Sequence, residues 1–388
     1  MKKNSTPIVL GLIMLGAVMR VPITAIPPIL TDIATGLGVP VSQLGILTSL
    51  PLIMFALCSS LAPLLAKKFG NEWLITLVLT TMLLGSVMRI VNLPFLFIGT
   101  MLLGAGIAVI NVLLPSLVST YFPKQVGRYT TLYITTMGAM ATVGSVVAVP
   151  AVSASSWKTF ILLLTAVIGL ALVVWLPNLS RQSRAKRKKE GVVLPSMWTN
   201  KTAWIFLIFG GLQSLIYYTE LTWLPTMART AGLTGSEAGI LAGIFSFISI
   251  PISMVTPTIV ARLKKEERAK VMLGVSSIMV VGLLLILIAP GNFMMWLVIH
   301  LLLGASVSVL FPYLMLSLSL KTSTTQATAQ LSGMVQTGGY LIAATGPVFL
   351  GYSYSRFGSW HPLVLILLLV TLLMMWTIVL IEKKETIA

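Results

Sequence analysis

The sequence has few of the side chains on which most enzymes depend. It contains one cysteine, Cys58, and two histidines, His300 and His361, so an internal disulfide and a CxxC metal or redox site are excluded. Nine acidic residues are spread along 388 positions, nearly all in or beside expected loops, which makes a paired-carboxylate active site hard to assemble. Neither a GxxxxGK(S/T) phosphate loop nor an HExxH zinc motif is present. We therefore expect a protein that is not an enzyme and that holds no metal and no cofactor.

Charged side chains of either sign are also scarce. Only 9% of the residues are charged and 57% are hydrophobic, whereas an ordinary soluble domain carries about 25% charged residues. Apolar runs of about 20 residues, the length that spans a bilayer, recur along nearly the whole chain. They predict an all-α integral membrane protein with twelve transmembrane helices, at residues 7–31, 42–65, 73–91, 94–121, 129–152, 157–177, 202–225, 237–261, 270–290, 293–320, 328–354 and 360–381.

The net charge of +17 would indicate nucleic-acid binding in a soluble protein, but the basic residues are distributed differently here. With both termini placed inside, most of the 26 lysines and arginines fall in loops on the cytoplasmic side. They include Lys2, Lys3, Lys67, Lys68, Lys124, Arg128, the run 181–189, Lys201, the cluster 262–270, Lys321, Lys383 and Lys384. Such a bias orients membrane helices. It predicts a multi-pass protein of a bacterial plasma membrane, with cytoplasmic termini and no nucleic-acid partner.

The most polar stretch separates two similar halves. Residues 178–201, with RQSRAKRKKE at their centre, are too charged to enter a bilayer and are expected to form a basic cytoplasmic linker. On either side of it, GVPVSQLGIL at 38–47 aligns with GLTGSEAGIL at 232–241, and LLGA at 102–105 recurs at 302–305. These matches indicate an internal duplication into pseudo-symmetric six-helix halves at 1–177 and 202–388, which is the plan of major facilitator transporters.

Several spans are rich in glycine, alanine, serine and proline. Examples are MGAMATVGSVVAVP at 137–150 and SGMVQTGGYLIAATGP at 332–347. Small residues allow close helix contacts, and proline allows a helix to bend. Helices that pack without moving can have the same composition. Because small residues and proline recur in both halves, we favour a moving interface between helices.

Ionisable residues inside the bilayer are costly and mark functional candidates. Arg20 lies near the middle of the first span, where it is either a ligand or gate for an anion or a structural arginine that bridges backbone carbonyls. Glu220 lies at a similar depth in the seventh span, where it could pair with Arg20, carry a proton or face outer water. Arg89 lies toward the outer end of the third span, so snorkelling to the headgroups is favoured over a gating role.

Neutral polar residues complete the candidate site. Those expected to contact a substrate are Asn111, Gln213, Tyr217, Tyr218, Gln336 and Tyr340. Gln336 and Tyr340 lie one helical turn apart and therefore share a face. His300 is a titratable candidate for gating or proton coupling, but a histidine bonded to a backbone carbonyl is the favoured interpretation. Trp198, Trp223 and Trp360 lie near span ends and are expected to be interface anchors.

Several segments, taken together, resemble the cyanate/2-nitroimidazole porter (CynX/NimT-type) family of the major facilitator superfamily. They are the Arg20 region, GILTSLPLIMFALCSSLAPLLAKKFG (45–70), GAGIAVINVLLPSLVSTYFP (104–123), TTMGAMATVGSVVAVP (135–150), SLIYYTELTWLP (214–225) and LSGMVQTGGYLIAATGP (331–347). The resemblance implies twelve helices, a central cavity and a small polar or anionic solute. It also implies that Arg20, Arg89, Asn111, Tyr217, Tyr218, Gln336 and Tyr340 occupy positions where the family carries like residues.

The sequence departs from the family pattern at two places. Ala66 precedes the basic pair Lys67 and Lys68, where the superfamily usually has an aspartate, so a charge relay in that loop is in doubt. Glu220 stands where the nitroimidazole porters have an apolar residue, so the resemblance assigns it no role.

From these features we predict a secondary active transporter that moves a small anionic or weakly acidic organic solute by alternating access. The alternative is a proton-coupled exporter of small apolar or heterocyclic drugs, which Glu220 and the twenty methionines favour. An intramembrane enzyme would need a nucleophile–base or metal constellation, and a receptor would normally add a soluble signalling module. The expected partners are the solute, the lipid bilayer and, in one version, a co-transported proton, and the expected oligomeric state is a monomer.

Overall fold

The structure is a computed structural model that describes residues 6–181 and 196–384, and over these residues it contains helices and turns but no strand. Residues 1–5, 182–195 and 385–388, and with them most of the predicted linker 178–201, lie outside the described residues. The chain divides into two compact units. Unit 1 contains the residues up to Val41 and those from Leu50 to the linker, and unit 2 contains Ser42–Ser49 and the residues after the linker.

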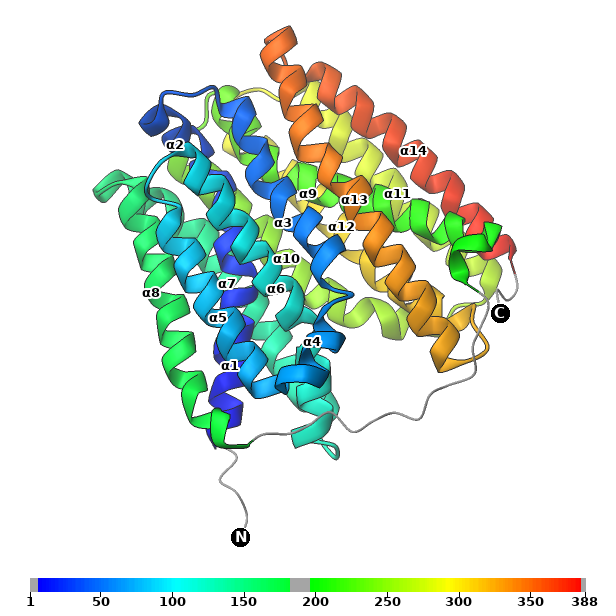
Figure 1. Cartoon of the computed structure of the whole chain (residues 1–388). Coiled ribbons are helices and arrows are strands. Elements are labelled where there is room, and N and C mark those ends of the chain that lie inside the picture. The colour runs from blue at the N-terminus through cyan, green and yellow to red at the C-terminus, as the bar shows by residue number, and fades with distance from the viewer. Residues whose placement is uncertain (1–5, 182–195, 385–388) are drawn as a thin grey trace. The chain divides into compact units, whose positions relative to one another are not determined.

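Unit 1 holds the helices of the first half (Figure 1). They are α1 (Thr6–Thr24), η1 (Pro27–Ile29), α2 (Leu30–Leu37), the later part of α3 (Ile46–Cys58), α4 (Ala62–Phe69), α5 (Asn71–Met88), α6 (Leu93–Tyr121), α7 (Val126–Ala154), α8 (Trp157–Trp175) and η3 (Leu176–Arg181). In this unit α1 packs against α7 and α8, and α5 packs against α6 and α8.

Unit 2 holds the helices of the second half, in which α9 and α13 lie side by side (Figure 1). They are η4 (Met197–Thr199), α9 (Lys201–Thr230), α10 (Gly235–Arg262), α11 (Lys265–Ile288), α12 (Phe293–Leu320), α13 (Thr325–Phe357) and α14 (His361–Lys383). Here α9 packs against α13 and α14, and α11 packs against α12 and α14. The order of pairing is that of unit 1, as an internal duplication requires.

Eleven helical segments of the described chain are long and apolar enough to cross a membrane. The 33-residue helix α13 completes the set of twelve, although glycine and polar residues dilute its apolar character. The all-α, twelve-helix fold expected from the sequence is thus confirmed. The main difference lies in the first two spans, which are not continuous helices.

The first span, expected at 7–31, is interrupted after Thr24. Proline has no backbone N–H to donate to a helical ladder, and Pro27 and Pro28 form the short turn η1 before α2 resumes. Helix α2 then ends at Gly38, whose φ of 67° is the left-handed conformation that glycine adopts without strain. The second span, expected at 42–65, likewise ends at Cys58, and α4 follows as a separate helix.

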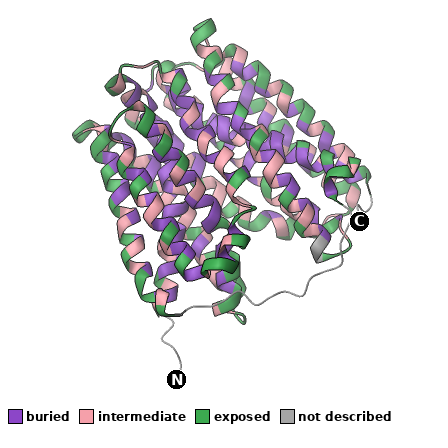
Figure 2. Cartoon of the chain, in the orientation of Figure 1, coloured by how far each residue is buried: buried purple, intermediate pink, exposed green. Residues whose placement is uncertain are grey.

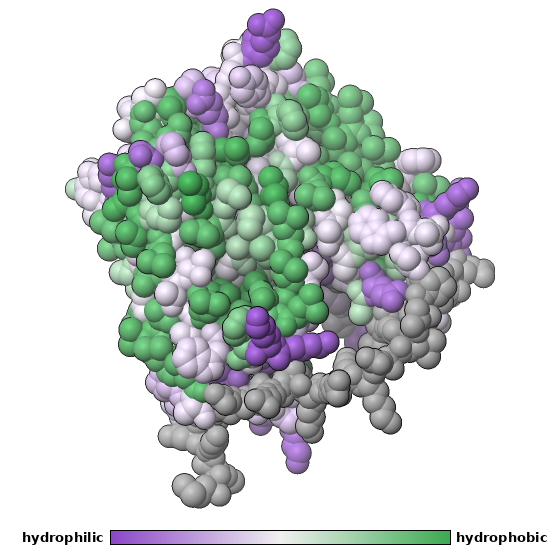
Figure 3. Space-filling model, viewed as in Figure 1, coloured by the Kyte–Doolittle hydropathy of each residue, from purple (hydrophilic) through white to green (hydrophobic). Residues whose placement is uncertain are grey.

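Apolar side chains cover the exposed faces of the long helices. Figure 2 shows exposed positions along α8 and α14, and Figure 3 shows hydrophobic side chains across the middle of the face in view, with hydrophilic ones near the helix ends. On α14 the exposed apolar residues include Leu365, Leu369, Leu372 and Trp376. Apolar surface of this extent suits lipid tails rather than water.

Candidate functional site

Arg20 lies in α1 just before the helix is interrupted. Its side chain is half-buried, and its carbonyl oxygen accepts a hydrogen bond from Thr24 Oγ1 at 3.1 Å. The amide of Ile26, which would reach the carbonyl of Pro22 in a regular helix, bonds instead to Ile23 at 3.3 Å. The carbonyl of Pro22 is therefore released from the helical ladder two residues after Arg20.

Arg89 satisfies this released carbonyl. Its side chain is only 1% exposed, and Nη1 donates a hydrogen bond to the oxygen of Pro22 at 3.2 Å. The expectation that Arg89 snorkels to the headgroups is therefore wrong. Its position near a span end suggested that a long side chain could reach the membrane surface, but the opening of α1 offers a buried acceptor nearby. Arg89 joins α5 to the interruption of α1.

Helix α7 holds the same segment from another side. The hydroxyl of Ser145 is shared between the carbonyl oxygens of Thr24, at 3.1 Å, and of Ala141 in its own helix, at 2.9 Å, and a Cβ at Gly144 would overlap the side chain of Val21. The glycine thus allows α1 and α7 to approach closely where α1 ends. The backbone that follows Arg20 is fixed by contacts from both α5 and α7.

Asn111 lies on a polar face of α6. Residues 106–110 are buried, but the next turns expose Asn111, Ser116, Ser119 and Thr120. The hydroxyl groups of Ser119 and Thr120 donate to the carbonyl of Ser116, so they are satisfied within the helix. A polar face within a membrane helix is normally turned toward protein or water rather than lipid tails. The structure thus places Asn111 at an exposed position on this face of α6.

The candidates of α9 lie in unit 2. Gln213 is buried and donates to the carbonyl of Gly210 at 3.1 Å and to Ser214 Oγ at 2.6 Å, so its amide is engaged within α9. The rings of Tyr217 and Tyr218 meet edge to face at 4.9 Å between centroids. Tyr217 also stacks on Phe245 of α10 at 6.0 Å.

The candidates of α13 lie on the helix that packs along α9. Gln336 Nε2 donates to Ser332 Oγ at 2.9 Å, and both Gln336 and Tyr340 are half-buried. Glycines permit the close approach of these helices, because a Cβ at Gly339 would lie 3.2 Å from the amide nitrogen of Gly211. The structure thus places the candidates of α9 and α13 on two adjacent helices.

Glu220 is the buried acid of α9. It is 2% exposed, and neither carboxylate oxygen accepts a hydrogen bond from any described residue. The possibility that it faces outer water is therefore ruled out. An ionised carboxylate that is buried without a partner loses its hydration, which costs several kcal/mol. This cost is roughly that of breaking a buried ion pair. The neutral acid avoids that cost, so Glu220 is suited to bind and release a proton.

His300 has the structural environment favoured from the sequence. The side chain is fully buried in α12, and Nδ1 lies 2.7 Å from the carbonyl oxygen of Trp296, one turn earlier. The two rings lie 6.1 Å apart. This contact ties His300 to its own helix.

Trp223 is not an interface anchor, contrary to the sequence-based expectation. It is fully buried, and its indole Nε1 donates to the carbonyl oxygen of Pro347 at 2.9 Å. A Cβ at Gly45 or at Gly351 would overlap the indole ring. Residues 42–49, which the sequence-based boundary assigned to the first half, thus pack within unit 2, where Ser42 is also hydrogen-bonded to Ser355.

Sequence reasoning missed a cluster of charges at the basic end of unit 2. Glu382 is buried and accepts a hydrogen bond from Tyr313 at 2.9 Å, with Arg268 Nε at 3.6 Å and Lys321 Nζ at 3.9 Å. The four residues join α11, α12 and α14. In the sequence, Glu382 stands next to basic residues at the end of the chain, which could have drawn attention to it. The spacing of residues could not predict which helices meet at this point.

Comparison with known proteins decides the family. The family model for the Major Facilitator Superfamily matches residues 8–347. The chain belongs to this superfamily. It is therefore a secondary transporter of a small-molecule solute and a multi-pass membrane protein, and it is not an enzyme.

Its relatives within the superfamily confirm the narrower resemblance. The chain is 34% identical over 370 residues to the uncharacterized transporter YycB of Bacillus subtilis (strain 168), covering 94% of this chain and 91% of the relative. It is 32% identical over 375 residues to a 2-nitroimidazole transporter of Escherichia coli (strain K12), covering 96% and 94%. It is 22% identical over 356 residues to the cyanate transport protein CynX of the same organism, covering 90% and 91%.

Solved structures show the same fold. A bacterial homologue of the human lysosomal transporter Spinster superposes with a TM-score of 0.76 at 12% identity, covering 98% of each chain. At this identity the likeness concerns the fold alone.

Proposed function

We propose that this transporter moves a small anionic or weakly acidic organic solute by alternating access across a bacterial plasma membrane, with both termini on the cytoplasmic side. We assign Arg20 as the anion ligand. Asn111, Gln213, Tyr217, Tyr218, Gln336 and Tyr340 would supply neutral polar and aromatic contacts to the solute. Glu220 would carry the coupled proton.

The proposal rests on one observation, which is that the backbone following Arg20 is held in place by side chains of other helices. The guanidinium of Arg20 lies on a membrane helix whose next residues are held by Arg89 and by Ser145. A guanidinium offers five donors in a rigid fork that matches planar anions. A ligand gains affinity when the groups that bind it are already held in place. The anchored interruption thus supplies a preorganised backbone next to the anion-binding group.

The relatives support the solute class. One is named for 2-nitroimidazole and another for cyanate. Cyanate is an anion, and 2-nitroimidazole is a small planar heterocycle with a weakly acidic N–H. Both could offer Arg20 an in-plane acceptor, so a solute of this size and charge is the proposed cargo.

A second candidate function is proton-coupled export of small apolar or heterocyclic drugs. The buried, unpartnered carboxylate of Glu220 favours proton coupling, and twenty methionines supply adaptable apolar surface. The two functions differ in what Arg20 does, because an uncharged drug needs no cation.

Uptake by purified protein in proteoliposomes tests the proposal, with 2-nitroimidazole and cyanate as probes. We expect saturable transport of at least one probe and at least a tenfold loss of apparent affinity in Arg20→Lys, because the bidentate fork is lost although the charge remains. Arg356→Lys, at the exposed end of α13, is the matched control and should transport like the wild type. Unchanged affinity in Arg20→Ala would exclude the anion-ligand role and favour the drug exporter.

A further inference from the structure

A groove runs along unit 2 between α10 and α11. Both helices pack against α12 but make few contacts with each other, so α12 forms the floor of the groove and the other two helices form its walls. The groove has a volume of about 430 Å³ and is lined by residues at 251–259, 275–278 and 305–309. Val255 and Ile259 of α10 are each 52% exposed, and Ile278 of α11 is 44% exposed. The groove is therefore open at the surface of these membrane helices.

The lining of the groove suits a hydrocarbon chain. None of the lining residues, all of which are described, is charged, and only Thr256 and Ser306 carry a polar side chain. Thr256 Oγ1 donates to the carbonyl of Ile252 at 2.7 Å, and Ser306 Oγ donates to the carbonyl of Leu302 at 2.7 Å. Both hydroxyl groups are thus satisfied within their own helices. A polar occupant would lose its hydration here without gaining partners.

The groove lies in the part of the helices nearest to their basic ends. At about 1.5 Å per residue, Ile259 and Pro251 lie about 5 Å and about 17 Å from Arg262, the last residue of α10. Ile278 lies about 20 Å from Lys265, the first residue of α11. The hydrocarbon core of a bilayer is about 30 Å thick, so one leaflet supplies about 15 Å. The groove therefore matches the acyl region of the leaflet beside the basic loops.

Two exposed cations lie at the basic end of the groove. Arg262 ends α10 and Lys264 directly precedes α11, so both belong to the short connection that joins the two walls. Val255, Ile259 and Arg262 follow one another at helical spacing and share a face of α10. The guanidinium thus extends from the same face that lines the groove.

The other charges near this connection have partners within the chain. Lys265 Nζ donates to the carbonyl of Lys383 at 3.4 Å, and Arg268 lies beside Glu382. Glu267 Oε2 accepts the backbone amide of Lys264 at 2.9 Å, and Glu266 is exposed in the same turn.

We propose that the groove binds one anionic phospholipid. An acyl chain would lie along α12, and the phosphate would lie between Arg262 and Lys264. Basic residues beside membrane helices attract anionic headgroups. A second copy of this chain fits less well, because its exposed acids at this end of the described residues are Glu266 and Glu267, next to the same two cations. The inference goes beyond the proposed transport and does not depend on the identity of the solute.

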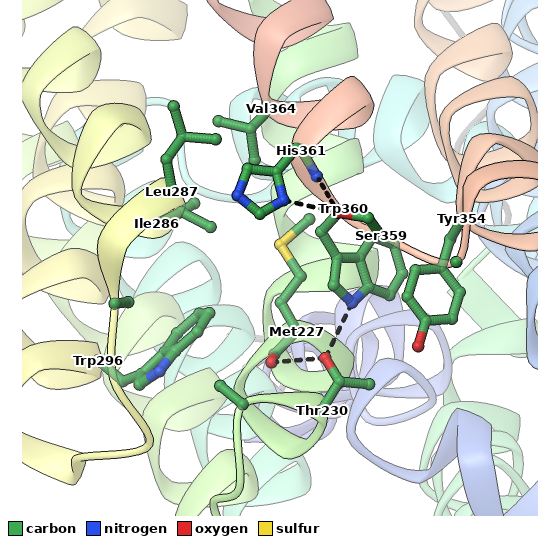
Figure 4. A pocket seen from close by; sticks show the side chains of 13 residues that line it. Met227, Thr230, Ile286, Leu287, Trp296, Tyr354, Ser359, Trp360, His361 and Val364 are labelled. Atoms are coloured by element: carbon green, nitrogen blue, oxygen red, sulfur yellow. Dashed lines mark hydrogen bonds between the residues drawn. The ribbon is translucent and has the colours of Figure 1, made fainter.

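A smaller cavity in unit 2 lacks this combination. It lies at the opposite end of the helices, has a volume of about 250 Å³, and is lined by the side chains shown in Figure 4. None of these described lining residues is a lysine or an arginine. The indole Nε1 of Trp360 already donates to Thr230 Oγ1 at 2.9 Å. This cavity offers a phosphate no cation, so we assign the lipid to the groove.

Native mass spectrometry of the full-length protein in detergent tests the inference. The probe is dioleoyl phosphatidylglycerol, and dioleoyl phosphatidylcholine is the matched lipid with the same chains and no net charge. We expect the first phosphatidylglycerol to bind at least tenfold more tightly than phosphatidylcholine. Glycerol 3-phosphate, which has no acyl chain, should not compete. Equal affinity of the two lipids, or full competition by glycerol 3-phosphate, would overturn the proposal.

Charge substitutions locate the headgroup. Arg262→Gln combined with Lys264→Gln should lower the affinity for phosphatidylglycerol at least tenfold. The matched control combines Lys67→Gln with Lys68→Gln, which removes two exposed cations from unit 1 and should leave the affinity unchanged. An equal loss in both pairs would show that binding follows net charge alone and would refute the site.

A tryptophan in the groove locates the acyl chain. Val255→Trp fills the groove from an exposed position and should weaken phosphatidylglycerol binding at least fivefold, whereas Leu365→Trp, on the exposed face of α14, should not change it. Unchanged binding in Val255→Trp would contradict the proposal. A wild-type dimer that dissociates in Val255→Trp would assign the groove to a second copy of the chain and would overturn the lipid assignment.

Discussion

Arg89 and Pro22 are 67 residues apart in the sequence, and Nη1 of the arginine donates to the carbonyl oxygen of the proline at 3.2 Å. The guanidinium replaces an amide donor that the interruption of α1 removes from the helical ladder. A buried cation thus has a structural reason to be present in unit 1. We therefore assign Arg89 a positioning role for the segment that follows Arg20.

Replacement of Arg89 should lower stability more than replacement of an exposed arginine. Arg89→Ala leaves both a cavity and an unpartnered carbonyl, and we expect it to lose about 3 kcal/mol of the free energy of unfolding. Arg89→Lys keeps the charge but not the fork, so an intermediate loss is expected. Thermal melts in detergent measure both changes, with Arg356→Ala as the control. A melting temperature for Arg89→Ala equal to that of the control would mean that the bond to Pro22 contributes nothing.

Glu220→Gln should remove the response of transport to a pH gradient. The glutamine imitates the protonated acid, so solute can still bind, but no proton can be carried. Uptake is measured with and without an imposed gradient in the wild type, in Glu220→Gln and in Glu237→Gln, which alters a half-buried acid in the first turn of α10. The control should respond like the wild type. An equal response in Glu220→Gln would transfer the coupling role to another group, and His300 is the next to test.

A disulfide between residues 42 and 355 should stop transport. The two serine hydroxyls are hydrogen-bonded in unit 2, so cysteines there are close enough to oxidise, and the Cys58→Ser background removes the only native thiol. In the proposed alternating-access cycle the segment 42–49 would have to change its contacts, which the crosslink would prevent. Uptake should fall at least tenfold on oxidation and recover on reduction. The single variant Ser42→Cys should be insensitive to oxidant, and full activity of the crosslinked protein would show that this packing persists throughout the cycle.

Cysteine labelling in intact cells should show the predicted orientation. In the Cys58→Ser background, a cysteine at Ser359 should react with an impermeant reagent added outside, because it lies in the loop before α14. A cysteine at Ser180, an exposed position after α8, should react only after the membrane is permeabilised. The reverse pattern would place both termini outside and contradict the prediction from the basic loops.

The spans and the duplication could be predicted because hydropathy and repeated motifs are local properties of the sequence. The environment of individual polar residues could not. Position near a span end suggested that Arg89 and Trp223 reach the membrane surface, yet each is buried because a carbonyl acceptor from a distant helix lies beside it. The isolation of Glu220 likewise depends on which side chains surround it. His300 was correctly interpreted because its partner, the carbonyl of Trp296, is one turn away on the same helix.

The packing of residues 42–49 against Trp223 and Pro347 has a consequence for how the two halves of the chain fold. If the chain were cut in the linker and the fragments made separately, the second fragment would lack the segment that covers this indole. We expect the second fragment to reach its native form only when it is made together with the first.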